Sequence, residues 1–441
     1  MTNFFQNQIA SALGSDIPPG PAVQTEGTAH HPSCFAVSDL ATASIAAAAS
    51  ELSTLLGTTN ATLDRRLASL WFANTIQPIG WETAPKWDPI AGAYPTNDGW
   101  IRLHTNAPIH RKAALAVLDC APEAAAVQAA VATWNGTALE SAIVAAGGAA
   151  AEMRALKDWQ AHQQGRAVVT EPLIAWDHTH AEAGARPLAD VRILDLTRIL
   201  AGPVCTRFMA GFGAQVLRID PPWWNEPSLE PEVTIGKRRA GLDLSNTADR
   251  QVFENLLAKA DVLVHGYRPG ALAAKGYDTA TRRKIAPNLI EVSLNAFGHT
   301  GPWRKRRGFD SLVQMSAGIA HEGMIRTRGD RPHPLPVQAL DHATGYLMAA
   351  AVLRALRRRN QTGQITSARL SLARTAKLLI DAGTRDIAGE PMEPEDADFD
   401  RAIEATAWGP AKRLRFPARI DCQGPVWTHT AGKLRVNAAK W

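Results

Sequence analysis

From residue 187 onward, apolar runs of strand length alternate along the chain with segments of helical length. The apolar runs lie at 191–196, 215–219, 261–265 and 288–294, and the helical segments between them include 201–212 and 245–260. This alternation is typical of a parallel sheet whose strands are joined by helices. The pattern therefore predicts an α/β fold, with a Rossmann-like, doubly wound parallel sheet over residues 187–375.

The first part of the chain has a different pattern. Ala-rich helical segments come first, and Asp98-Gly99 supplies a hairpin turn before the alternating strand at 100–104. Helical patterns follow, so we expect a second, smaller α+β domain. The expected boundaries are 1–37 for a Pro- and Gly-rich N-terminal arm, 38–165 for the small domain, 166–186 for a linker, 187–375 for the large domain and 376–441 for a tail that packs on the large domain.

Composition adds limits to this picture. A chain of 441 residues exceeds the usual size of a single core, which agrees with two domains. The net charge of +5 favours anionic ligands, but basic residues are not interleaved with aromatic ones, so nucleic acid is not an expected partner. The cysteines are scattered, which predicts reduced thiols in a cytoplasmic protein and no metal site. The N-terminal residues resemble neither a signal peptide nor a membrane span.

One carboxylate, Asp341, stands immediately before a long helical run at 343–358. Free backbone N–H groups and the helix dipole favour the ionised form of an acidic side chain at a helix start. An ionised carboxylate can act as a nucleophile. The alternative is that Asp341 is a structural N-cap, and the residues around it leave both interpretations open.

In doubly wound sheets, ligands bind outside the carboxyl ends of the strands. The loops expected there include Arg198 after the first strand and Arg268 after the third. The glycine patterns of dinucleotide-binding and P-loop proteins are absent. Basic clusters at 236–239 and 304–307 could face phosphates, or they could be solvated loops.

Seven segments, taken in their order and spacing, resemble the class III CoA-transferases, the family of formyl-CoA and carnitine CoA-transferases. They lie at 193–203, 213–222, 237–238, 242–244, 260–264, 268–272 and 298–302. The resemblance implies that Asp341, with Gly345 four residues later, is the nucleophile, although Leu340 replaces a glycine of the family pattern. It also implies a mixed anhydride and an aspartyl-CoA thioester on Asp341, from which CoA passes to an acceptor acid.

The same resemblance implies the ligands and the assembly. Acyl-CoA and a carboxylic acid would be the substrates, with no permanently bound cofactor, and the protein would be a homodimer. The residues implied in CoA binding are Arg198, Ile199, Leu200, Ala201, Lys237, Arg238, Tyr267 and Arg268. Pro221 stands where a basic side chain often occurs in the family, and the family's Gly-rich loop has no counterpart.

Two further departures leave alternatives open. The small domain precedes the nucleotide-binding half, which indicates a permuted or degenerate tandem arrangement. Racemases of the same family resemble this chain at 308–310, but Phe309 stands in place of a histidine. Because inversion of a carbon centre needs two bases and Phe cannot exchange a proton, racemisation is disfavoured. A CoA-binding protein without transferase chemistry, or an acyl-CoA racemase or isomerase, remain the alternatives to a CoA-transferase.

Overall fold

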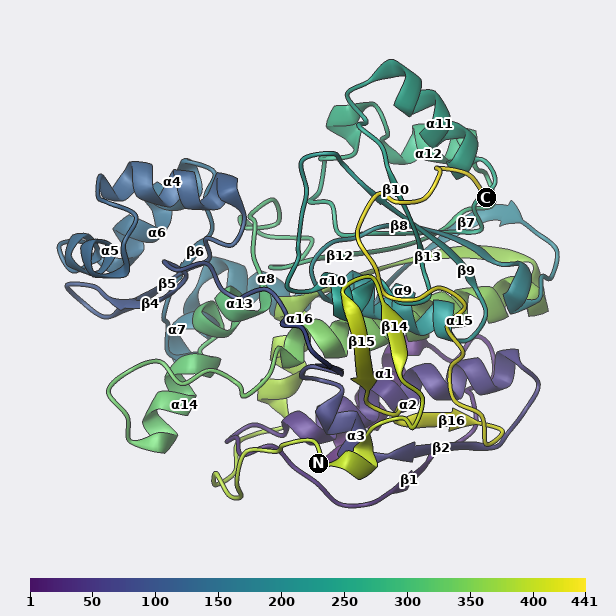
Figure 1. Ribbon diagram of the computed structural model, residues 1–441, viewed down its shortest axis with the longest axis horizontal. Helices are drawn as coiled ribbons and strands as arrows, with labels where there is room; N and C mark the ends of the chain where they lie inside the picture. Colours follow the sequence, from purple (N-terminus) through teal and green to yellow (C-terminus); the bar gives the residue numbers. More distant parts are fainter.

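A seven-stranded sheet forms the centre of the computed structural model, which describes residues 1–441 without the side chains of residues 180–182 (Figure 1). The strand order is β10-β9-β8-β11-β12-β13-β7, and every neighbouring pair is parallel except β13 with β7. Counted from β8 along the chain, the parallel strands therefore follow the order 3-2-1-4-5-6 of doubly wound sheets. The predicted α/β class is confirmed. The strands are β7 (Ala175–Glu182), β8 (Arg192–Leu196), β9 (Gln215–Asp220), β10 (Arg238–Gly241), β11 (Val262–His265), β12 (Ile290–Asn295) and β13 (Gln364–Ser371).

Helices cover both faces of this sheet. Successive side chains of a strand point to opposite faces, so Ile193 of β8 packs in the core with α9 and α15, whereas Leu194 packs in the core with α11. Of the helices on the two faces, α9 spans Ala201–Gly211, α11 Thr247–Leu257, α12 Thr279–Ile285 and α15 Ala339–Thr362. The long helix predicted at 343–358 is thus confirmed, and it begins four residues earlier than predicted.

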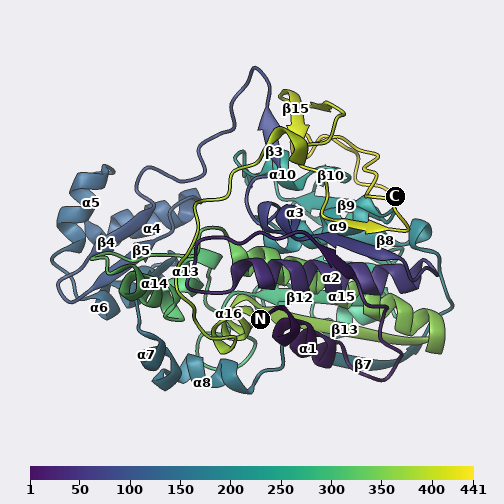
Figure 2. The same ribbon diagram turned by 90° about the horizontal axis from the view of Figure 1, so that it is seen from below.

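The N-terminal residues pack on the large domain. Helix α2 (Val37–Leu55) lies against α15, and α1 (Thr2–Leu13) lies beside it with Phe5 and Ile9 in the core (Figure 2). The expected surface arm and the expected start of the small domain at residue 38 therefore differ from the structure. The physical reason is that α2 is Ala-rich and buried around most of its surface, so it fits closely on α15.

Buried ion pairs join these helices. Glu51 of α2 pairs with Arg357 at 2.6 Å and with Arg354 at 3.4 Å, and both arginines lie on α15. Since an unpaired charge inside a core is strongly destabilising, the pairing explains why a run of arginines in α15 is buried.

A smaller unit has its own core. Strands β4 (Gly92–Pro95) and β5 (Trp100–Leu103) form the predicted hairpin, β6 (Ala150–Glu152) pairs with β5, and α4 (Pro108–Leu118) covers them (Figure 1). Together with α5 (Ala124–Val131) and α6 (Gly136–Ala145), they form an α+β unit that is shorter at its N-terminal end than the expected domain.

The C-terminal segment returns to both the N-terminal residues and the sheet. Strand β15 (Gly409–Arg413) pairs with β3 (Ile76–Pro78), and β16 (Ala418–Ile420) pairs with β2 (Ala61–Asp64). Trp441 donates its indole N–H to the Leu256 carbonyl on α11. The other elements are β1 (Gln24–Glu26), β14 (Glu404–Thr406), α3 (Arg65–Leu70), α7 (Leu156–Ala161), α8 (Gln163–Thr170), α10 (Glu230–Val233), α13 (Asp310–Ser316), α14 (Ile319–Thr327), α16 (Leu372–Asp381) and three short 3-10 helices, Leu188–Asp190, Ala273–Lys275 and Asp396–Asp398. In the part of the chain described, each helix is too short or too polar to traverse a lipid bilayer.

Candidate functional site

A cavity of about 410 Å³ contains Asp341 and lies between the sheet and the small unit. The large domain contributes the loops after β8 and β9 and the first turn of α15, whereas the small unit and the segment leading to it contribute Trp87 and His104. The loops at the carboxyl ends of two central strands therefore border Asp341, as the order of the strands favours. The volume is within the range of small-molecule sites, roughly 300–1,000 Å³.

Asp341 lies beside a second carboxylate, Asp310, at the start of α13. The Asp310 carboxylate accepts the backbone N–H groups of Leu340 and Asp341, both at 2.9 Å. Asp310, rather than Asp341, thus caps α15, and the interpretation of Asp341 as the N-cap is wrong. The side chain of Asp341 is left free for the cavity.

The ionisation of Asp341 also differs from the expectation. Burial and the neighbouring Asp310 raise the pKa of Asp341 well above its usual range, and the backbone amide of Ala201 acts in the opposite direction. Burial also raises the pKa of Asp310, although its hydrogen bonds favour the charged form. Desolvation and the like charge of Asp310 thus shift the pKa of Asp341 in the direction opposite to the one expected from its place at the helix start.

Ile199 and Leu200 line the cavity in the loop between β8 and α9, and Ala201 is the first residue of α9, with its backbone amide next to Asp341. Ile199 has a φ of 65°, a left-handed conformation that is strained for a β-branched residue. Its backbone N–H donates to Glu226 at 2.8 Å. The Glu226 carboxylate also accepts the Trp224 indole N–H at 3.0 Å, so the loop after β9 holds the loop after β8 in this conformation.

Arg198 and Tyr267 come together where the strand order reverses. They follow the adjacent strands β8 and β11, and the Arg198 guanidinium donates to the Tyr267 hydroxyl at 3.3 Å. The same guanidinium lies 4.9 Å from the centre of the Trp224 ring. The structure thus brings these two predicted residues together at the crevice in which doubly wound proteins bind ligands.

Arg268 borders a second cavity, of about 550 Å³, together with Arg307. Arg268 donates to the Lys305 carbonyl at 2.9 Å, and Arg307 donates to the Gly147 carbonyl at 3.1 Å. Among the described side chains, neither guanidinium forms an ion pair with a carboxylate. Burial and the nearby Arg307 lower the pKa of Arg268. Two cations that repel each other would be stabilised by an anion between them.

The two other predicted CoA-binding residues are placed differently. The Lys237 ammonium is fully buried and donates to Asp195 at 3.2 Å, to the Pro203 carbonyl at 3.0 Å and to Thr206 at 2.6 Å. The prediction that Lys237 faces a phosphate is therefore wrong, since its three donors serve the contact between β8 and α9. Arg238 begins β10 and lies near the C-terminal segment, with a contact of 3.4 Å to the Ala438 carbonyl.

Two histidines, His104 and His342, line the cavity. The His104 ring stacks on Phe309 with 3.7 Å between ring centres, and burial lowers its pKa to about 3. His342, next to Asp341, has its pKa lowered to about 3 by burial. Both imidazoles are therefore neutral at physiological pH. The stacking brings an imidazole to Phe309, the position at which the resembling racemases carry a histidine.

Several residues at the site were not named as candidates from the sequence: Asp310, Trp223, Trp224, Glu226, His104 and His342. Arg307 belongs to the basic cluster at 304–307, for which a phosphate contact was one of two interpretations. The run 223–226, with its paired tryptophans in a strand-end loop, was a usable signal. His104 had none, because its position depends on how the small unit meets the large domain. Within the described residues, no group of His, Cys, Asp and Glu side chains has the arrangement of a metal site.

Comparison with known proteins supports the resemblance. Residues 188–405 match CoA-transferase family III. An acyl-CoA transferase of Fusarium pseudograminearum is 30% identical over 256 residues, which are 52% of each chain. The succinyl-CoA–L-malate CoA-transferase beta subunit of Chloroflexus aurantiacus is 33% identical over 192 residues, 40% of this chain and 47% of that protein. The chain spans about half the length of the curated relatives it matches.

Among solved structures, the crystal structure of Rv3272 from Mycobacterium tuberculosis matches with 27% identity and a TM-score of 0.39, over 46% of this chain and 61% of that one. Among the curated sequence relatives, the mouse succinyl-CoA:glutarate CoA-transferase is 32% identical over 192 residues, 41% of this chain and 44% of that protein. The family match begins just before β8, the first of the parallel strands, and extends beyond Asp341. Residues 188–405, just under half of the chain, are thus similar to CoA-transferase family III.

Proposed function

We propose that this protein transfers CoA between carboxylic acids, with Asp341 as the nucleophile. The observation that carries the proposal is the placement of the Asp341 carboxylate in a cavity between the strand-end loops and the small unit. Names of the relatives, such as succinyl-CoA:glutarate CoA-transferase, support the reaction class. Transfer of CoA by the whole protein is part of the proposal because the matches cover only about half of each relative.

The proposed reaction begins when the ionised Asp341 carboxylate attacks the thioester carbonyl of an acyl-CoA. The carbon–sulfur bond breaks, CoA leaves as a thiolate, and an acyl-aspartyl anhydride remains. The thiolate then attacks the aspartyl carbonyl, which releases the donor acid as a carboxylate and leaves CoA on Asp341 as a thioester. The acceptor carboxylate repeats these steps in reverse, so that acyl-CoA forms and Asp341 is restored. The raised pKa of Asp341 makes its carboxylate a more basic nucleophile once it is ionised.

CoA is proposed to lie across the crevice between β8 and β11. Arg198 and Tyr267, which share a hydrogen bond at this crevice, would contact CoA. Arg268 and Arg307 are the best candidates for contacts with phosphate, since no carboxylate among the described side chains pairs with either. Ile199, Leu200 and Ala201 would contact the thioester end next to Asp341.

Chemical trapping tests the proposal. We expect incubation with acyl-CoA and hydroxylamine to convert Asp341 to a hydroxamate, which peptide mass spectrometry detects as a defined mass change. Asp341→Asn should abolish both the mark and CoA transfer. A wild-type protein that binds CoA, stays unmarked and moves CoA to no acid in a broad panel would instead be a CoA-binding protein without transferase chemistry.

Proton transfer at the α-carbon of an acyl-CoA is the second candidate function, because His104 and Asp341 line the same cavity. An imidazole and a carboxylic acid are the two kinds of group that such a reaction requires. Incubation of a 2-methylacyl-CoA in D₂O separates the two functions: α-deuteration without a CoA acceptor supports isomerase or racemase chemistry, and no deuteration excludes it.

The homodimer and the cytoplasmic location stay part of the proposal. The family resemblance supports the dimer, and the unpaired state of Cys34, Cys120, Cys205 and Cys422 agrees with a reducing compartment. Light scattering of the full chain tests the first, and fractionation of cells tests the second.

A further inference from the structure

The cavity that holds Asp341 has an aromatic entrance. Trp223, in the loop after β9, is 61% exposed, and Trp87, in the segment before the small unit, is 38% exposed. Both line the cavity, as do Trp224 and Phe309. Because tryptophan is mostly buried in soluble proteins, exposed indoles that border a cavity mark a surface for an apolar ligand.

The aromatic side chains at this entrance differ in how firmly they are held. The Trp87 ring is fixed by the Arg102 guanidinium, 4.8 Å from its centre, and by the edge of His104, 5.8 Å between ring centres. The Trp224 indole is tied to Glu226 by its hydrogen bond of 3.0 Å. Trp223, by contrast, is largely exposed. Two indoles are thus positioned in advance and the third is free to pack on a ligand.

The charges of the cavity wall disfavour a second carboxylate on the acyl group. Five of the charged side chains that line the cavity are carboxylates, and two, Lys86 and Arg207, are cations. Arg207 is buried and already donates to the Glu232 carbonyl at 2.8 Å, with the Glu232 carboxylate at 3.4 Å. Lys86 is exposed. Among the described residues of the wall, neither cation is both buried and free of a neighbouring carboxylate. A second carboxylate on the acyl group would therefore be buried without a partner, which is costly.

We propose that this cavity takes acyl-CoA substrates with a bulky apolar, preferably aromatic, acyl group, and that Trp223 and Trp87 determine this specificity. This inference rests on the proposed function, which places the thioester carbonyl at Asp341. The rest of the acyl group would then lie among these indoles. Aromatic rings that pack on indoles gain both from burial and from ring–ring geometry. Short dicarboxylic acyl groups would gain neither and would meet a wall rich in carboxylates.

Binding of a matched series of thioesters tests the proposal. Calorimetry with the full-length Asp341→Asn chain, which cannot turn over, would compare free CoA, acetyl-CoA, succinyl-CoA and phenylacetyl-CoA. We expect phenylacetyl-CoA to bind about tenfold or more tightly than acetyl-CoA, from the apolar area that the ring buries, and succinyl-CoA to bind no better than acetyl-CoA. Tryptophan fluorescence should change with phenylacetyl-CoA and much less with acetyl-CoA.

Substitutions at the entrance test whether Trp223 and Trp87 cause the preference for phenylacetyl-CoA. Adding Trp223→Ala or Trp87→Ala should reduce the preference for phenylacetyl-CoA to within about threefold, because only part of the ring's buried area remains, while the affinity for free CoA stays unchanged. Ile325→Ala, which changes an exposed apolar residue on α14 that is 55% exposed and outside the cavity, should leave the preference intact. Lys86→Met should leave the rank order unchanged.

Two results would overturn the inference: tightest binding of succinyl-CoA that is lost with Lys86→Met, or a preference for phenylacetyl-CoA that survives both tryptophan substitutions. A separate measurement on the wild-type chain tests the proposed function. If phenylacetyl-CoA binds as expected but CoA passes to no acid, the transferase proposal fails and the specificity stands. If CoA transfer proceeds and succinyl-CoA is the best donor, the specificity fails and the transferase proposal stands.

Discussion

Asp310 accepts the backbone N–H of Asp341 at 2.9 Å while its negative charge raises the pKa of the Asp341 carboxyl. One side chain thus has two opposite effects on the same neighbour: it fixes the backbone of Asp341 at the start of α15 and disfavours ionisation of its side chain. An enzyme that needs a basic carboxylate nucleophile gains from this arrangement, since the more basic oxygen attacks faster once the proton has left.

The first prediction concerns Asp310→Asn. The amide oxygen can still accept the N–H groups of Leu340 and Asp341, but the negative charge beside Asp341 is removed. We therefore expect the pKa of Asp341 to fall, so that the ratio of kcat/KM at pH 6 to kcat/KM at pH 8 rises. Asp381→Asn, which removes the surface partner of Lys377, should leave this ratio unchanged. An identical pH profile for Asp310→Asn and wild type would contradict the coupling of the two carboxylates.

The second prediction concerns the stability of Asp341→Asn. The folded-state pKa of Asp341 is raised above its unfolded value of about 3.8. Its contribution to stability is therefore present below that value and is lost as the pH rises through the folded pKa. Asn has no charge to bury, so the free energy of unfolding of the variant should exceed that of wild type by about 1–2 kcal/mol at pH 8 and by less at pH 5. Activity should fall by about 10³-fold or more. Urea denaturation at both pH values provides the measurement.

Much of the large domain could be predicted because its strands are nearly continuous apolar runs. β8, β9, β11 and β12 were recognised in this way, and the length of the helical run around Asp341 identified α15. The edge strand β10 was missed, since its Arg-rich residues are not an apolar run. The association of α2 with α15 was also missed, because an Ala-rich helix does not reveal which sheet or helix it will cover.

The sequence named candidate site residues one segment at a time, and their catalytic and binding roles stay predictions. Asp341 and the loop at 198–201 belong to local patterns. Asp310 lies about 30 residues before Asp341, and its two roles arise from hydrogen bonds that no local pattern encodes. Lys237 shows the reverse error: a basic residue in a long loop was expected to meet a phosphate, but its partners are the buried Asp195 and Thr206.

The third prediction separates these roles for Lys237. Lys237→Met would leave Asp195 buried with a partner removed, so we expect a loss of about 3 kcal/mol or more in the free energy of unfolding. The pKa of Lys237, lowered to about 8 by burial, agrees with an ammonium that is shielded from water. The affinity of the folded variant for CoA should stay unchanged in calorimetry. Lys259→Met, at an exposed position in the turn that follows α11, is the matched control. A large loss of CoA affinity in Lys237→Met alone would restore the predicted role of Lys237.

The fourth prediction concerns the phosphate contacts. Arg268→Ala and Arg307→Ala should each weaken CoA binding by about tenfold, the loss of one charge-assisted hydrogen bond. The free energy of unfolding should change little, because neither side chain forms an ion pair with a described carboxylate. Arg304→Ala is the control, because Arg304 is an exposed cation in the same loop as Arg307 and lies outside the second cavity. The CoA affinity of this variant should equal that of wild type. If all three variants bound CoA as tightly as wild type, the second cavity would be excluded as the phosphate site.

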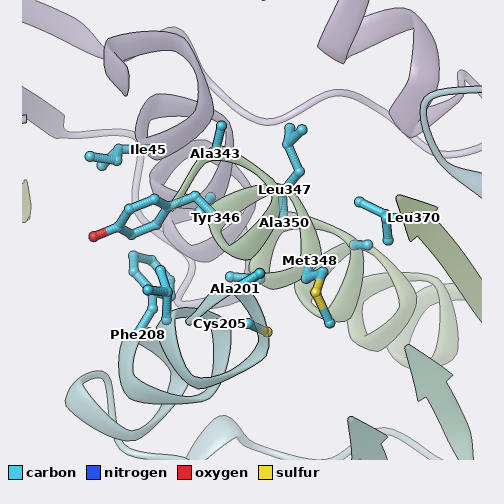
Figure 3. Packing of buried hydrophobic residues seen from close by; sticks show 14 of the residues in the cluster. Ile45, Ala201, Cys205, Phe208, Ala343, Tyr346, Leu347, Met348, Ala350 and Leu370 are labelled. Carbon is cyan, nitrogen blue, oxygen red and sulfur yellow. The ribbon is translucent and has the colours of Figure 1, made fainter. Parts of the chain in front are cut away.

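The last prediction concerns the contact between α9 and α15, shown in Figure 3, where Phe208 of α9 lies next to Tyr346 of α15. The two helices come close together at Gly345: a Cβ added there would lie 2.5 Å from the Ala201 carbonyl oxygen and 2.8 Å from the Val204 Cβ. Gly345→Ala must therefore push the helices apart, which should cost about 1–3 kcal/mol of stability. The same displacement moves the Ala201 amide relative to Asp341, so kcat should fall more than stability alone explains.

Gly99→Ala, at a position with no atom within 4 Å of the added Cβ, should change neither stability nor kcat. Measuring kcat at a temperature where Gly345→Ala remains fully folded isolates the effect on the site, and an unchanged kcat there would show that the spacing of α9 and α15 serves stability alone.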